Sequence, residues 1–130
     1  MTDFYTNSYA DNVRFARSKT ILSPSAGTLN LIRIPKFAFV KRVWLEVDTA
    51  GSSDTVSIGW RDGSTAQSAG FISTDIAKVT VTGMKESIAD TLTSSMAKYF
   101  DSSSGAITMT IGTTQTTGKF TVFCEYTVIH

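Results

Sequence analysis

The chain has 130 residues, of which 42% are hydrophobic and 18% charged, so it is long enough for one domain that folds without a metal or a disulfide. Its single cysteine, Cys124, cannot form an intramolecular disulfide, and no apolar run of about 18 residues is present, which excludes a transmembrane helix. Residues 1–42 hold seven basic and two acidic side chains, a net +5, and the remainder holds five basic and nine acidic, a net −4. This asymmetry favours docking onto an acidic partner or another copy of the chain.

The first 18 residues are polar with isolated aromatics, and their spacing fits neither a strand nor an amphipathic helix. A freely solvated tail is usually poor in aromatics, so residues 1–18 are predicted to form an extended arm outside the strands that orders against a neighbour or its own body. Aromatic and arginine side chains are typical of interfaces. The candidate interface residues are therefore Phe4, Tyr5, Tyr9, Arg14, Phe15 and Arg17, together with Trp44 further along the chain.

Residues 19–130 are predicted to form a single β domain. Its first half holds a short strand at 19–23, a strand at 28–34 that ends at Pro35, and a long strand at 37–48. In the long strand the odd positions predict a buried face interrupted by Lys41, with Trp44 on the opposite, polar face; these positions are Phe37, Phe39, Val43, Leu45 and Val47.

In the middle of the chain, the alternation in 55–60 predicts a strand that buries Val56, Ile58 and Trp60. Residues 61–70 are predicted to be a long polar loop, after which Phe71 and Ile72 anchor the chain to the core. A strand is expected at 76–82. Residues 83–100 are ambiguous, because Met84, Ile88, Leu92 and Met96 recur at helical spacing among Thr and Ser that disfavour a helix, so a short helix or an irregular excursion is expected.

The final third holds two clear strands. Ile107, Met109 and Ile111 point inward from 106–112, and 113–117 is predicted to be a hairpin loop. From Lys119 to the end, Phe120, Val122, Cys124, Tyr126 and Val128 alternate with polar or solvent-facing residues. Short strands separated by turns predict an all-β fold: an antiparallel β-sandwich or jelly roll with an extended N-terminal arm and at most one short helix.

No arrangement of residues predicts catalysis. The one histidine, His130, is terminal, no Cys or His set suits a metal, and no phosphate or dinucleotide motif is present, so no enzyme activity, cofactor or metal is expected. Glu46 and Glu125 are the best carboxylate pair, and solvated strand faces carry such residues routinely. Trp44 and Trp60 suit either sugar stacking or packing; a core position is favoured for Trp60, and an interface or a second buried face for Trp44.

Four stretches in order resemble small β-sandwich virion structural proteins of tailed bacteriophages, which serve as capsid decoration, head-fibre or tail-accessory subunits. The similarity covers roughly residues 28–128, and every motif in it is a strand edge or a turn. The stretches are Ile34-Pro35-Lys36-Phe37-Ala38-Phe39-Val40; Val43-Trp44-Leu45-Glu46-Val47-Asp48-Thr49-Ala50; Val56-Ser57-Ile58-Gly59 with Asp62-Gly63 and Gly70-Phe71-Ile72-Ser73-Thr74-Asp75; and Ile107-Thr108-Met109-Thr110 with Gly118-Lys119-Phe120-Thr121-Val122.

The resemblance implies a non-enzymatic virion subunit, a capsid decoration (cement) or head-accessory protein assembled in the host cytoplasm. Its expected partners are itself, with a trimer favoured, and the major capsid protein or other virion proteins. A membrane is not expected as a partner, and neither is nucleic acid, because the basic residues are dispersed and no stacking motif accompanies them. The alternative is a carbohydrate-binding module or a tail or fibre subunit for host recognition.

Overall fold

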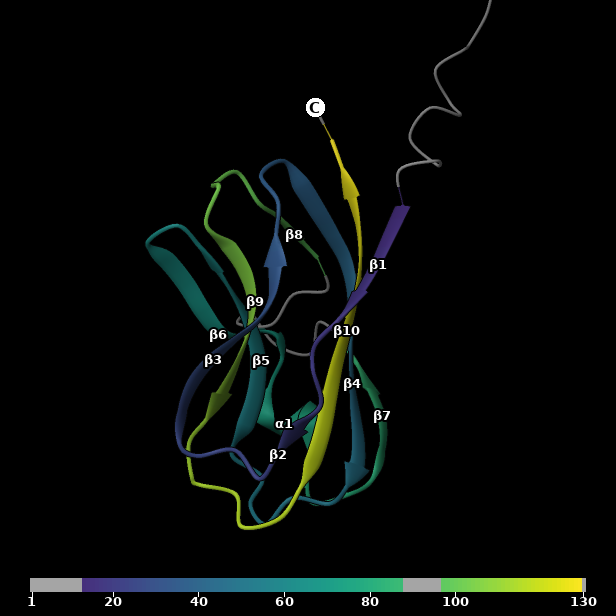
Figure 1. Cartoon of the computed structure of the whole chain (residues 1–130), viewed down its shortest axis with the longest axis vertical. Coiled ribbons are helices and arrows are strands. Elements are labelled where there is room, and N and C mark those ends of the chain that lie inside the picture. Colours follow the sequence, from purple (N-terminus) through teal and green to yellow (C-terminus); the bar gives the residue numbers. More distant parts are fainter. Residues whose placement is uncertain (1–12, 88–96, 130) are drawn as a thin grey trace, which may run out of the picture.

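A computed structural model of the chain describes residues 13–87 and 97–129. Over these residues the protein is two facing antiparallel sheets with one short helix, which confirms the all-β prediction (Figure 1). Sheet A contains β1 (Val13–Arg17), β2 (Ile21–Leu22), β4 (Ala38–Thr49), β7 (Gly83–Glu86), β8 (Lys98–Tyr99) and β10 (Lys119–Val128). Sheet B contains β3 (Gly27–Ile34), β5 (Val56–Asp62), β6 (Thr65–Ile72) and β9 (Gly105–Ile111), and the helix is α1 (Thr74–Ala77).

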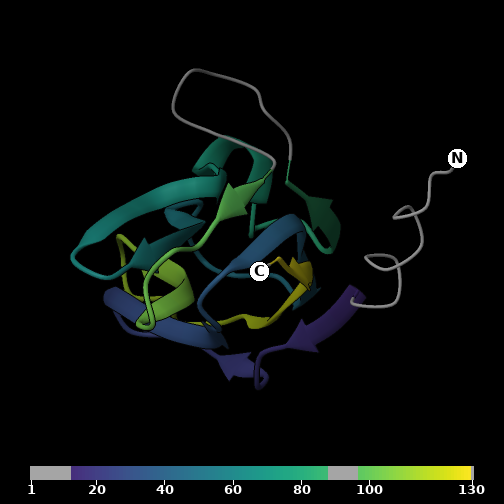
Figure 2. The same cartoon turned by 90° about the horizontal axis from the view of Figure 1, so that it is seen from above.

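The strand order is that of a jelly roll. The strand order is β1-β10-β4-β7 in sheet A and β3-β9-β5-β6 in sheet B. The two short strands of sheet A lie at its edges: β2 pairs with β10 on the side of β1, and β8 pairs with β4 on the side of β7. The chain crosses between the sheets after β2, β3, β4, β6, β8 and β9. These crossings stack the sheets as two layers, seen end-on in Figure 2.

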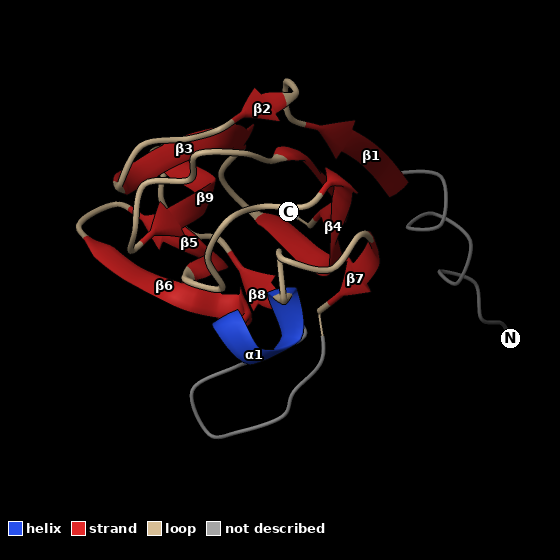
Figure 3. Cartoon of the chain, turned by 90° about the horizontal axis from the view of Figure 1, so that it is seen from below, coloured by secondary structure: helices blue, strands red, loops and turns tan. Residues whose placement is uncertain are grey.

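The core lies between the layers and is built from the inward side chains of both sheets. Phe71, Phe100 and Phe120 are among its largest fully buried residues. The predicted anchors Phe71 and Ile72 and the inward set Ile107, Met109 and Ile111 are buried as expected. The short helix α1 closes one edge of the sandwich, where it contacts β5, β6 and β7 (Figure 3).

In the long strand β4, the residues before Lys41 face the opposite side of the sheet from the one predicted. Glu125 pairs with Arg42 but the next residue, Tyr126, pairs with Val40, so Lys41 is an extra residue in β4. Because a β-bulge reverses which residues face inward, Ala38 and Val40 are buried before it and Val43, Leu45 and Val47 after it. Phe37 and Phe39 were therefore wrongly assigned to the buried face; Phe37 is exposed and has a positive φ of 70°.

Residues 61–70 are not a long loop, because β5 and β6 form a hairpin joined by Gly63 and Ser64. Gly63 has a φ of 66°, which the first central position of a type II′ hairpin turn requires. The polar side chains that suggested a loop are the exposed residues at the start of β6. The sequence contains the signal Gly63-Ser64, because a glycine at the first central position is typical of a type II′ hairpin turn.

The strand predicted at 76–82 is wrong, since α1 and a turn occupy this part of the chain. Val79 is buried, whereas Val81 is exposed, so their alternation does not mark a paired strand. Two polar side chains hold the turn. Asp54 accepts hydrogen bonds from the backbone N–H and the hydroxyl of Thr80, at 2.9 and 3.0 Å, and Lys85 donates to three carbonyl oxygens between Ala77 and Val81, at 2.8 to 3.0 Å.

The ambiguous stretch 83–100 is strand at both of its described ends, β7 and β8, rather than helix; residues 88–96 lie outside the described part. The predicted hairpin loop at 113–117 instead carries the chain from sheet B to sheet A. Gln115 fixes this crossing: its buried side chain accepts from Ser52 and Ser53 N–H and donates to the carbonyls of Ser53 and Thr113, at 2.8 to 3.1 Å.

Part of the predicted N-terminal arm belongs to the sheet. Residues 13–17 form β1, which pairs with β10 from Val13 opposite Thr127 to Arg17 opposite Phe123. Ser18 continues this contact, because its N–H donates to the Val122 carbonyl at 2.8 Å and its hydroxyl accepts from the Val122 N–H at 3.0 Å. Only the small Ala16 packs toward the core from β1, which is why the alternation was not visible in the sequence.

Candidate functional site

A diagonal row of apolar side chains crosses the outer face of sheet A. The four neighbouring strands β1, β10, β4 and β7 each contribute one side chain to it. Arg17, Phe123, Trp44 and Glu86 form one cross-strand row, because Phe123 pairs with both Arg17 and Trp44, and Trp44 pairs with Glu86. Phe15 lies one same-face position before Arg17 on β1, and Met84 lies one such position before Glu86 on β7. The resulting diagonal is Phe15, Phe123, Trp44 and Met84.

These side chains surround an open hollow of about 460 Å³, lined by Phe15, Arg17, Trp44, Met84 and Phe123, with Ala16 and Cys124 also contributing. The lining is almost wholly apolar and Arg17 is its one charged residue. Phe15 is 73% exposed and Met84 57% exposed, so the single chain leaves much of this apolar surface in water. Apolar surface gathered into one concave patch is typical of a site that binds another molecule.

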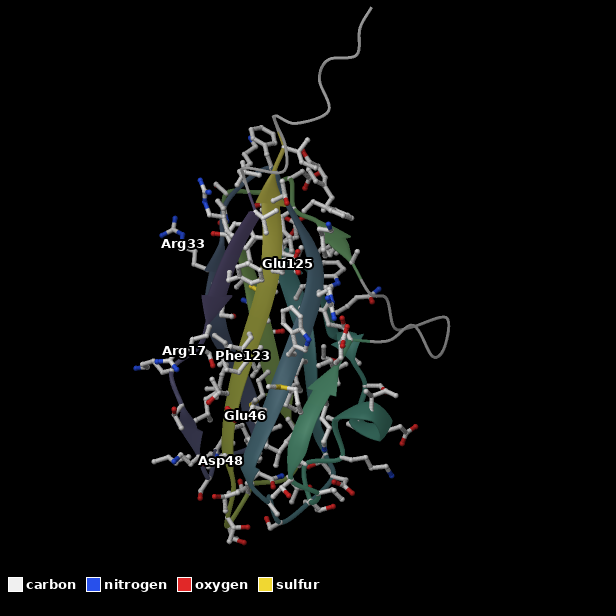
Figure 4. The ribbon with its side chains drawn as sticks, turned by 90° about the vertical axis from the view of Figure 1, so that its right-hand side faces the viewer. Arg17, Arg33, Glu46, Asp48, Phe123 and Glu125 are labelled. Carbon is white, nitrogen blue, oxygen red and sulfur yellow. The ribbon has the colours of Figure 1, made fainter. Side chains whose placement is uncertain are left out.

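Charged residues border the diagonal. The Arg42 guanidinium donates from Nε and Nη2 to Glu86 Oε2, at 2.9 and 2.6 Å, and lies 4.8 Å from the centre of the Trp44 ring. Glu46 and Glu125 stand on the same outer face, with Phe123 between them along β10 and β4 (Figure 4). An apolar centre with a mixed-charge rim is the usual composition of a protein–protein interface.

The seven predicted interface residues fall into three groups. Phe15, Arg17 and Trp44 come together at the hollow although Trp44 is distant in sequence. Arg14 alternates to the other side of β1 and is exposed, so it is not part of the lining. Phe4, Tyr5 and Tyr9 lie outside the described residues.

Two of the four side chains on the diagonal, Phe123 and Met84, were not predicted from the sequence. Phe123 stands on the outward-facing side of the last strand, where the alternation otherwise places Lys119, Thr121, Glu125 and Thr127. An aromatic on a polar face was the available signal. Met84 was interpreted as one member of a helical series, and only its pairing with Glu46 across β7 and β4 brings it to the hollow.

A second cluster joins the sheets at one end of the sandwich. Asp62 of β5 forms an ion pair with Lys98 of β8 at 3.3 Å, and the Lys98 ammonium lies 4.1 Å from the centre of the buried Trp60 ring. Burial raises the pKa of Asp62, but hydrogen bonds from the Asp101 backbone and from Lys98 outweigh it and leave the pKa below its ordinary value. Trp60 also meets Phe100 edge-on, with ring centres 6.4 Å apart. This cluster is a packed contact between the sheets.

The described residues offer little for catalysis. Burial raises the pKa of the Cys124 thiol to about 12, so the thiol stays protonated at neutral pH and is a poor nucleophile. No group of His, Cys, Asp or Glu side chains that could hold a metal ion occurs within 13–87 and 97–129. Over the same residues, no helix is long and apolar enough to cross a membrane.

Solved structures of bacteriophage capsids contain chains with this fold. A chain of the cyanophage Pam1 capsid asymmetric unit is 15% identical and has a TM-score of 0.66 over 99% of this chain and 92% of its own. A chain of the acid-stable capsid of Helicobacter pylori bacteriophage KHP30 is 17% identical, with a TM-score of 0.62 over 88% and 86%. A chain of the Ralstonia phage GP4 capsid is 13% identical, with a TM-score of 0.62 over 100% and 92%. No protein-family model and no curated protein sequence matches the chain.

Proposed function

We propose that this chain is a non-enzymatic structural protein of a bacteriophage virion, a capsid decoration or head-accessory subunit that binds the particle and self-associates. The observation that carries the proposal is the outer face of sheet A. Its apolar diagonal, supplied by four strands and bordered by Arg42, Glu86 and Glu125, has the composition of a surface that other subunits cover.

The fold supports the same proposal from a different direction. Chains in three phage capsids share the architecture over 88 to 100% of this chain, so the shared part is the whole domain and not a local motif. A jelly roll is itself common to proteins of several functions, including capsid proteins and lectins, so fold alone does not assign the role. The proposal therefore combines the fold with the particular surface of sheet A.

The alternative of a carbohydrate-binding module finds less support from the two tryptophans. Sugar rings stack on exposed aromatic faces, but Trp60 is buried against Lys98 and Phe100. Trp44 is half-buried and the Arg42 guanidinium occupies one face of its ring. We therefore assign Trp44 to a protein interface and make glycan binding an outcome of the test.

The experiment uses co-sedimentation of the purified full chain with phage particles assembled without it. The native chain is expected to sediment with the particles, and a Trp44→Ser/Phe123→Ser variant is expected to bind at least tenfold more weakly. The control is Thr28→Ala/Thr110→Ala, which alters the exposed outer face of sheet B and is expected to bind like the native chain. A native chain that stays in the supernatant, or that binds a glycan array instead, would contradict the proposal.

A further inference from the structure

The lining of the hollow on sheet A suits a partner that is largely apolar and places a negative charge at Arg17. Its walls are Phe15, Trp44, Met84 and Phe123, and its one charged lining residue is Arg17, which forms no ion pair within the described part of the chain. A single aromatic side chain buries roughly 150–250 Å² on docking, so a few inserted rings would cover most of such a patch. The matching ligand is a short segment with aromatic anchors and acidic residues.

Residues 1–12 of this chain have that composition. They contain Phe4, Tyr5 and Tyr9 as possible anchors, with Asp3 and Asp11 as acidic residues, and they contain no Lys or Arg. Their charge is thus opposite to that of Arg17. Residues 14–42 hold seven basic side chains and no acidic one, a net +7, so the acidic aromatic segment and the basic region that follows it are distinct parts of the sequence.

The position and length of this segment allow it to reach a neighbour. Residues 1–12 directly precede Val13, the first residue of β1. From Val13, β1 runs toward the hollow at Phe15 and Arg17. The residues before Val13 therefore join β1 at the end away from Arg17. Twelve extended residues span at most roughly 40 Å, about twice the width of roughly 19 Å of four paired strands. The segment is long enough to reach the corresponding hollow of an adjacent copy.

From this juxtaposition we infer that the hollow on the outer face of sheet A binds residues 1–12 of a second copy of the chain. The inference rests on the proposed function and identifies the self-association contact within it. Each copy gives its N-terminal segment to one neighbour and receives the segment of another, which is a head-to-tail contact that closes into a ring when the rotation between copies allows it. A trimer built in this way is a closed ring with three such contacts.

The test mixes two full-length variants that are defective in opposite halves of the contact. The segment variant is Phe4→Ser/Tyr5→Ser/Tyr9→Ser and the hollow variant is Trp44→Ser/Phe123→Ser. Light scattering coupled to size-exclusion chromatography is expected to show an oligomer for the native chain and a monomer for each variant alone. An equimolar mixture is expected to form a dimer of the two variants, because the intact segment of one enters the intact hollow of the other.

A matched control separates this contact from general loss of apolar surface. Val81 is 58% exposed in the turn after α1 and does not line the hollow, so Val81→Ser is expected to leave the oligomer unchanged. Circular dichroism and thermal melting of each variant check that the fold is retained. A synthetic peptide of residues 1–12 added to the segment variant is expected to change its tryptophan fluorescence, and a peptide with the three serine substitutions is expected not to do so.

Three results would overturn the inference: a native chain that is monomeric at about 100 µM, a segment variant that oligomerises like the native chain, or folded variants that remain monomers when mixed. Failure of the proposed function gives a different result. If the variants complement each other but the native chain does not bind particles, the segment contact stands and the particle role fails. If the segment variant is unaffected while the hollow variant alone loses particle binding, the hollow faces the capsid and the inference fails.

Discussion

The two sheets bury similar inner faces but present different outer faces. The outer face of sheet A is aromatic and charged, with Phe15 and Met84 left exposed. The outward residues of sheet B include small and basic side chains: Ser57 and Thr108 are buried there, the exposed hydroxyls of Thr28 and Thr110 lie 3.3 Å apart, and the exposed Arg33 and Arg61 flank Ala106. The difference indicates that exposed aromatic and apolar side chains gather into one hollow on sheet A, and that this face is where a partner is expected.

Sheet B is covered in part by its own chain. Between the pairs Ile58–Ile72 and Trp60–Gln67 the register shifts, so the backbone of β6 folds over Gly59. The Ser57 hydroxyl donates to the Ser68 carbonyl at 2.8 Å, and a Cβ at position 59 would overlap the carbonyl oxygen of Gln67. This self-covering leaves sheet B with no need of an external partner at that position, whereas the hollow of sheet A remains open.

The prediction with the largest expected effect tests whether the inner faces of the two sheets contribute equally to stability. Val122→Asp in sheet A and Ile107→Asp in sheet B each place an unpaired carboxylate in the fully buried core. Each should lower the free energy of unfolding by several kcal/mol, enough to unfold a domain of ordinary stability. Urea denaturation followed by circular dichroism measures this. A folded Ile107→Asp variant beside an unfolded Val122→Asp variant would show that sheet A alone holds the core.

A second prediction tests whether sheet A is closed to solvent beneath the hollow. Burial raises the pKa of Cys124 from 9.0 to about 12, so above pH 9 the unfolded chain loses a proton that the native chain keeps. Stability attributable to this thiol is therefore present below pH 9 and is lost as pH rises toward 12. The loss is at most about 1.4 kcal/mol for each pH unit.

The measurement compares the pH dependence of the unfolding free energy in the native chain and in Cys124→Ala, because tyrosines and lysines titrate in the same range in both. The native chain should lose stability more steeply above pH 9. In parallel, iodoacetamide at pH 8 should modify the unfolded chain and leave the folded chain unmodified. Rapid modification of folded protein would mean that the hollow opens through to the core.

The prediction with the smallest expected effect tests whether the outer faces of the two sheets contribute to the stability of the monomer. Glu86→Gln removes the ion pair with Arg42, whose two side chains are 46% and 40% exposed, so its loss should lower the free energy of unfolding by less than about 1 kcal/mol. Thr110→Ala on sheet B should have a similarly small effect. Thermal melting of both variants checks this. A large effect of Glu86→Gln would assign that pair to folding and weaken the assignment of the face to a partner.

Much of the fold could be predicted because burial imposes a period of two on strands. The inward residues of β9 and β10, the anchors at Phe71 and Ile72, and the all-β class all follow from this alternation. Two of the errors occurred where a single backbone event interrupts this alternation. The bulge at Lys41 reversed the faces of β4, and the hairpin turn at Gly63 divided a polar stretch that has the composition of a loop.

The candidate site was only partly predictable, because it depends on register between strands that are distant in sequence. Local composition identified Phe15, Arg17 and Trp44 one by one, and placed Phe123 on an outward face. That Phe123 stands between Arg17 and Trp44, and that Met84 completes the diagonal, is decided by how β1, β10, β4 and β7 pair. Sequence by itself determined which residues seek burial, since side-chain chemistry and alternation are local properties. Only the tertiary structure decided which exposed residues share a surface, since cross-strand register is fixed by packing of the whole sandwich.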